Sequence, residues 1–168
     1  MPDKNAALQS KKLDIAASGE PLITIAEQQG IAVRWREMAD DFPDLPYSTM
    51  VYGPNLLSND PLAGVRLMRA YLQGVRDYED AFTRARDYDA VVGTLADPLK
   101  TPAPLFKAIQ SGGGLAYFDP NGAVRIDTLK PILELWTRTG LVQPGYDLNS
   151  LVDPGPAQQA AASLAKYP

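Results

Sequence analysis

The pattern of apolar and polar residues divides the chain near residue 60, with short apolar segments before it and helical periodicity after it. Residues 13–17 are short and apolar, which suits a buried strand, and Ile31–Arg36 alternates apolar with polar residues as a strand with one solvated face does. Pro21 and Gly30 are well placed to begin and end a helix between them. Residues 47–52 form a third strand candidate because they are rich in residues with high β-propensity. A strand, a helix and a second strand in so few residues predict parallel pairing in an α/β sheet.

Beyond Asp60 the pattern is helical. Asp60 followed by Pro61 predicts a helix start. Apolar residues then recur at spacings of three and four up to Phe82, which predicts an amphipathic helix of about six turns. Shorter helices are predicted over 89–96, 104–110, 128–139 and 154–164, with turns at 111–114 and 118–122. The expected fold class is therefore α/β, with a short parallel or mixed sheet early in the chain followed by mostly helices.

Composition narrows the function classes. The chain has no cysteine and no histidine, which removes thiolate nucleophiles, zinc clusters, the commonest general base and the commonest metal ligand. We therefore expect no catalytic residue, no metal and no cofactor. The net charge of −4 argues against nucleic acid, because phosphate binding needs a concentrated basic surface. No apolar run is long enough to span a bilayer, and the first residues do not form a signal peptide.

Three stretches carry a resemblance to a known family. They are residues 7–21 (ALQSKKLDIAASGEP), residues 63–82 (AGVRLMRAYLQGVRDYEDAF) and the end of the chain from Asp119-Pro120-Asn121-Gly122 to Asp153-Pro154. Their order and spacing resemble the solute-binding proteins of ABC importers, in the branch for nitrate, sulfonates, taurine and thiamine-pyrimidine precursors. The resemblance extends over essentially all 168 residues and corresponds to the C-terminal half of such proteins.

The resemblance implies a type II periplasmic-binding-protein fold, with two lobes that close over a ligand about a hinge. Residues 1–46 would form the end of the second lobe and the hinge crossing, as a βαβ unit. Residues 47–168 would form the C-terminal, mostly helical part of the first lobe. It further implies a small-molecule ligand, the permease subunits of an ABC transporter as partners, and a periplasmic or cell-surface location.

Ser18, Gly19 and Glu20 are the best ligand-side candidates. They follow a predicted strand and open a helix, where free backbone N–H groups and the helix dipole favour anions. Glu20 would instead select a cationic or hydrogen-bond-donating group, and a plain helix cap at a hinge is the structural alternative. Tyr52 ends the third predicted strand, where it would form an aromatic wall of a pocket or simply pack with its hydroxyl in water.

Three function classes follow. The first is part of a solute-binding component of an ABC importer, for a small organic solute such as a sulfonate, nitrate, taurine or a pyrimidine precursor. The second is a truncated protein of the same scaffold that acts as an interaction module or has no function. The third is an enzyme, which is disfavoured because relatives of this architecture with chemistry depend on histidine or cysteine.

Overall fold

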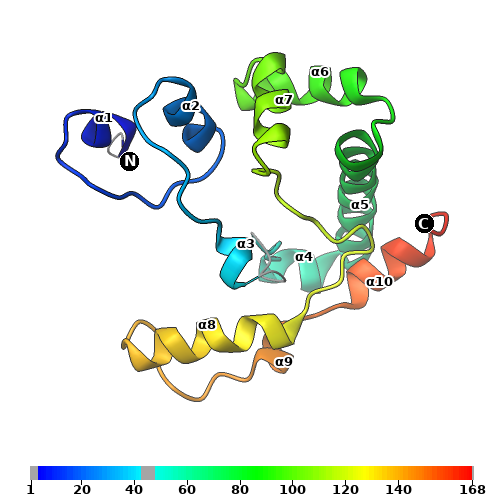
Figure 1. The fold of residues 1–168 in the computed structure, drawn as a ribbon. Coiled ribbons are helices and arrows are strands. Elements are labelled where there is room, and N and C mark those ends of the chain that lie inside the picture. Colours follow the sequence, from blue (N-terminus) through cyan, green and yellow to red (C-terminus); the bar gives the residue numbers. More distant parts are fainter. Residues whose placement is uncertain (1–3, 43–47, 168) are drawn as a thin grey trace.

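The computed structural model describes residues 4–42 and 48–167, and all the regular secondary structure within them is helical (Figure 1). The helices are α1 (Lys4–Gln9), α2 (Leu22–Gln28), α3 (Met38–Asp41), α4 (Pro54–Asn59), α5 (Pro61–Arg84), α6 (Tyr88–Leu99), α7 (Ala103–Ser111), α8 (Ile126–Arg138), α9 (Leu148–Leu151) and α10 (Gly155–Ala162). The predicted boundary between two lobes, at residues 46 and 47, lies outside the described residues.

The predicted α/β fold is wrong. Residues 13–17, 31–36 and 48–52 are irregular connections that belong to no sheet in the described part of the chain; the start of the third candidate, Tyr47, lies outside it. The backbone N–H of Ile31 donates to the carbonyl of Ala26 at 2.9 Å, and that of Arg34 donates to the side chain of Glu27 at 3.1 Å. These amides are bonded to α2 rather than to a neighbouring strand.

In residues 31–36 the apolar side chains are exposed and a charged one is buried, which is the reverse of what a strand packed on a core would show. Val33 and Trp35 are 88% and 79% exposed, whereas the side chain of Arg34 between them is only 15% exposed. An arginine turns inward here because three carboxylates lie on that side to receive it. Arg36 is also about half exposed, so burial in this segment does not follow the alternation expected of a strand.

The helices predicted after residue 60 are confirmed. The side chain of Asp60 accepts a hydrogen bond from the backbone N–H of Ala63 at 2.9 Å and caps α5, which begins with proline as expected. Their boundaries differ from the predicted ones by up to three residues, and because α8 begins at Ile126, Pro131 lies inside that helix. α5 is the longest of the described helices, and Figure 1 shows α6 at one of its ends and α4 and α10 at the other.

Two small cores lie along α5. In the first, Met68 and Leu72 pack against Ala157 and Ala160 of α10, and Leu72 is fully buried. In the second, Ala81 and Phe82 pack against Val92 of α6 and Phe106 of α7. The second core is aromatic, and the rings of Tyr78 and Phe82 lie 4.7 Å apart between their centroids. α5 therefore contributes residues to both cores.

Candidate functional site

The most highly charged cluster that involves a predicted site residue is centred on Arg34. Its guanidinium donates to Oε1 of Glu20 at 2.7 Å, to Oε2 of Glu27 at 3.1 Å and to Oε1 of Glu37 at 2.5 Å. The hydroxyl of Thr24, a buried residue, lies 3.4 Å from the same guanidinium. The side chains of Arg34 and Glu20 are 15% and 16% exposed, whereas those of Glu27 and Glu37 are 34% and 37% exposed, so the central pair is largely buried and the other two carboxylates are partly exposed. We call these four charged residues the Arg34 cluster.

Local chain geometry brings the cluster together. Glu20 precedes α2 and Glu27 lies within it, so their separation of seven residues places both on one side of that helix. Gly30, with φ +65°, then reverses the chain so that the following residues run back beside α2. Arg34 consequently meets Glu27, and Glu37 follows as the residue that begins α3.

The glycine-rich turn after α7 forms one wall of the cluster. A Cβ atom on Gly114 would lie 2.3 Å from Oε1 of Glu20, and one on Gly112 would lie 3.4 Å from Nη2 of Arg34. Residues 111–114 are predicted as a turn from sequence, and residue spacing does not reveal that this turn approaches Glu20. A side chain at Gly114 would therefore displace the Glu20 carboxylate from its present position beside Arg34.

The hydrogen bonds within the cluster stabilise the charged forms of Arg34 and Glu27. Burial acts to lower the pKa of Arg34, but hydrogen bonds to Glu37, Glu27 and Glu20 outweigh it and raise that pKa. The hydrogen bond from Arg34 is the main cause that lowers the pKa of Glu27, against an opposing effect of burial. With all four residues ionised, three carboxylates face one guanidinium, and the cluster carries two excess negative charges.

This arrangement selects cations and hydrogen-bond donors rather than anions. The carboxylate of Glu20 accepts the backbone N–H of Thr24 at 3.2 Å, so the chain's own anion already occupies the beginning of α2. A bound sulfonate or nitrate would have to displace it and would meet excess negative charge. An amino or ammonium group would find carboxylate oxygens as acceptors.

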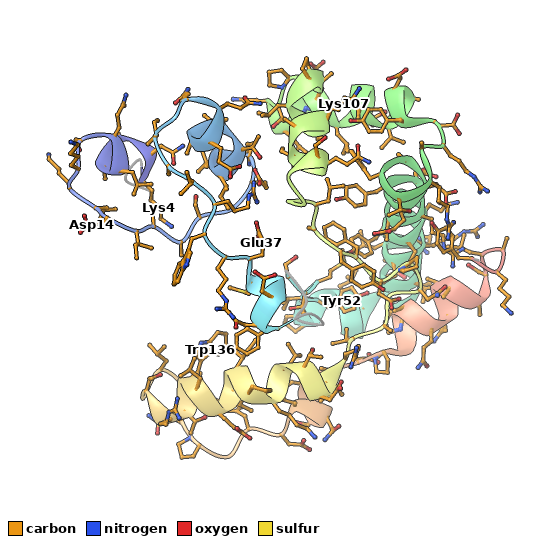
Figure 2. All side chains as sticks on the ribbon, in the orientation of Figure 1. Lys4, Asp14, Glu37, Tyr52, Lys107 and Trp136 are labelled. Atoms are coloured by element: carbon orange, nitrogen blue, oxygen red, sulfur yellow. The ribbon has the colours of Figure 1, made fainter. Side chains whose placement is uncertain are left out.

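The structure separates the predicted site residues: Glu20 belongs to the Arg34 cluster, and Tyr52 lies in another part of the molecule. Ser18 and Gly19 are half-buried and lead directly into Glu20, and the carbonyl of Gly19 accepts the backbone N–H of Leu22 at 3.1 Å. Tyr52 packs against the core shared by α5 and α10. Burial, with a smaller effect of the charge of Asp153, raises the pKa of Tyr52. Figure 2 shows Glu37 at the start of α3 and Tyr52 separately, beside α4.

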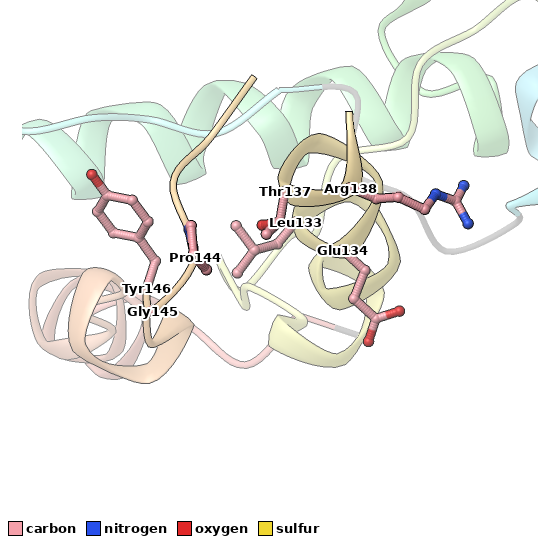
Figure 3. Close-up of a pocket in the computed structure, with 7 residues that line it drawn as sticks. All are labelled: Leu133, Glu134, Thr137, Arg138, Pro144, Gly145 and Tyr146. Atoms are coloured by element: carbon pink, nitrogen blue, oxygen red, sulfur yellow. The ribbon is translucent and has the colours of Figure 1, made fainter. Parts of the chain in front are cut away.

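A shallow depression of about 370 Å³ lies between α8 and the segment before α9. Leu133 and Pro144 face one another across it, whereas the charged ends of Glu134 and Arg138 point away (Figure 3). A ligand pocket usually combines apolar walls with a few convergent polar groups. This depression has only the apolar part, so it is a weaker candidate than the Arg34 cluster.

Sequence reasoning found Glu20 but missed Arg34, Glu27 and Glu37.

Comparisons with known proteins add no assignment: no family model, no curated protein and no solved structure matches the chain. Among the described residues, no group of histidine, cysteine or acidic side chains is arranged to hold a metal ion. None of the described helices is both long enough and apolar enough to cross a membrane.

Proposed function

We propose that this protein is a solute-binding component of an ABC importer, in which the Arg34 cluster forms one side of the ligand site. The observation that carries the proposal is the cluster itself, because Glu20 was singled out from sequence and lies at its centre with Arg34 at 2.7 Å. A partly buried network of this kind holds its carboxylates in set directions, which is what recognition of a small polar solute requires.

Contacts between the stretches that carry the family resemblance support the same proposal. Arg76, from the long-helix stretch, donates from Nε to the carbonyl of Pro120 at 2.9 Å and from Nη2 to the side chain of Asn121 at 3.0 Å. Gly122 packs against Leu72 of the same helix. Residues that were matched separately along the sequence are thus neighbours in space.

The excess negative charge restricts the chemical class of solute that the cluster can bind. Among the solutes that the family resemblance suggests, a pyrimidine precursor with amino groups offers hydrogen-bond donors to carboxylates. Nitrate, sulfonates and the sulfonate end of taurine do not. We therefore propose an amino-bearing solute of the pyrimidine type, held by the carboxylates of Glu20, Glu27 and Glu37, because a carboxylate oxygen can accept more than one hydrogen bond.

Thermal unfolding with and without ligand tests this function. An aminopyrimidine should raise the Tm of the protein, and nitrate and sulfonates that lack an amino group should not. A ligand at one hundred times its Kd adds about 2.7 kcal/mol to the stability of the folded state. Glu20→Gln should abolish the shift, whereas Glu134→Gln, at the exposed depression on α8, should leave it unchanged. If no ligand shifts the Tm, or if both variants respond alike, the proposed function is wrong.

An interaction module is the second candidate, and exposed apolar side chains favour it. Ile15, Val33, Trp35 and Val51 lie in the irregular segments of the first half and are each more than two thirds exposed. Exposed apolar side chains gathered in a patch mark partner-binding sites in many proteins. Stable binding of a protein partner to these segments, with no Tm shift from any solute, would favour this function over solute binding. Val33→Ser and Trp35→Ser should then weaken the association.

A further inference from the structure

The C-terminal residues form a separate attachment on α5. Residues 155–167, which we call the strap, comprise α10 and the tail that follows it. Ala157 and Ala160 of the strap pack against Met68 and Leu72 of α5. A Cβ atom on Gly122 would lie 3.1 Å from Cδ2 of Leu72 and 3.2 Å from Cβ of Ala157, so these two side chains meet at Gly122. We call this surface of α5 and Gly122 the strap groove.

The tail is held by a second set of contacts, all polar or aromatic. Arg76 donates from Nη1 to the carbonyl of Ala165 at 2.7 Å, and the hydroxyl of Tyr167 donates to Oδ1 of Asp80 at 2.9 Å. The guanidinium groups of Arg76 and Arg84 lie 5.4 and 4.7 Å from the centroid of the Tyr167 ring. These contacts fix the end of the strap to α5.

None of these contacts involves the segment that leads into the strap. The chain enters it from α9 through Val152, which is extended at φ −104° and ψ 115°, and through Asp153 and Pro154. The strap's partners lie 87 and 89 residues earlier for Tyr167 and Ala165. The same contacts would form unchanged if the strap came from another molecule, because only the short connection would be rearranged.

We propose that the strap groove is a docking site for the strap of a second copy of this chain, so that two molecules can exchange residues 155–167. α10 has eight residues, too few to be a stable helix alone in water, so a released strap gains its structure only in a groove. Within one molecule, the effective concentration of a strap on a short connection is in the millimolar range. The single chain is therefore the main form in dilute solution, and exchange occurs in concentrated solution.

The absence of cysteine allows the exchange to be measured by disulfide trapping. Leu72→Cys and Ala157→Cys are made on separate full-length chains, which are unfolded together, refolded at about 1 mM and oxidised. A disulfide-linked heterodimer forms when the strap of one chain lies in the groove of the other. Leu72→Cys mixed with Leu141→Cys is the control, since Leu141 is exposed and lies outside the strap. We expect at least about fivefold more heterodimer than in the control, and less of it on dilution.

Two outcomes would overturn the proposal. The double variant with both cysteines on one chain must form an internal disulfide in dilute solution; failure to do so would mean that the strap does not lie in the groove. If the internal disulfide forms but the mixed chains yield no more heterodimer than the control pair, the strap does not exchange. Deletion of Val152, which shortens the connection, is a further check and should increase the heterodimer.

Discussion

Replacement of Arg34 by methionine tests the Arg34 cluster most directly. Arg34→Met keeps most of the apolar stem of the side chain but removes the guanidinium that neutralises three carboxylates. Glu20, Glu27 and Glu37 would then lie close together without a counter-charge. We expect the variant to fold but to be clearly less stable at neutral pH.

The magnitude follows from the exposure of the partners. Ion pairs in full contact with water contribute about 0–1 kcal/mol, and loss of one partner of a fully buried pair costs about 3–5 kcal/mol. The side chain of Arg34 is 15% exposed, and those of Glu27 and Glu37 are 34% and 37% exposed. The cluster lies between the two limits, so Arg34→Met should lower the free energy of unfolding by about 2 kcal/mol.

The effect should depend on pH with a definite sign. In the wild type the folded-state pKa of Glu27 is lowered, so its contribution to stability is present above the unfolded pKa of about 4.3 and is lost as pH falls through the folded value. In the variant, the three carboxylates repel one another without a counter-charge, so neutralising them in acid relieves the folded state. The stability difference between wild type and variant should therefore be largest near neutral pH and should shrink below about pH 4.

Urea unfolding followed by circular dichroism, repeated from neutral to acidic pH, measures this difference. Arg36→Met is the matched control, because the pair of Arg36 with Asp41 at 2.5 Å is about half exposed on both sides. The control should cost at most about 1 kcal/mol. If Arg34→Met costs no more than Arg36→Met, or if its cost does not shrink in acid, the cluster does not stabilise the fold as reasoned here.

Two further predictions concern the core between α5 and α10. Leu72→Ala should lower the free energy of unfolding by about 2–5 kcal/mol, because it opens a cavity at a fully buried site. Leu67→Ala, on the exposed side of α5, should lower it by less than about 1 kcal/mol. Equal losses in urea unfolding would contradict the packing of Leu72. Gly122→Ala should lower the Tm more than Gly113→Ala: both glycines have positive φ, but only at Gly122 would the added Cβ press on Leu72 and Ala157. A smaller Tm loss for Gly122→Ala would show that the strap does not pack there.

The candidate site was only half visible in the sequence. Glu20 stood out because it lies between a predicted strand and a helix, and the structure keeps it at the start of α2. Arg34 was assigned to the solvent because alternation identifies two faces but not which one is buried. Tyr52 was predicted to end a third strand, and without a strand there it packs against the core between α5 and α10.

What the sequence determined by itself is the set of local elements. α5 was predicted by its apolar spacing and by the Asp60–Pro61 start, and the end of α2 by Gly30, because caps, turns and helical periodicity depend on residues within a few positions of one another. Only the tertiary structure decided which distant segments of the chain contact one another. Whether residues 31–36 join a sheet or return along α2, and whether the turn at Gly114 touches Glu20, depends on partners far along the chain. A strand is stabilised by such partners and a helix by its own hydrogen bonds, so the helices were predicted correctly and the sheet was not.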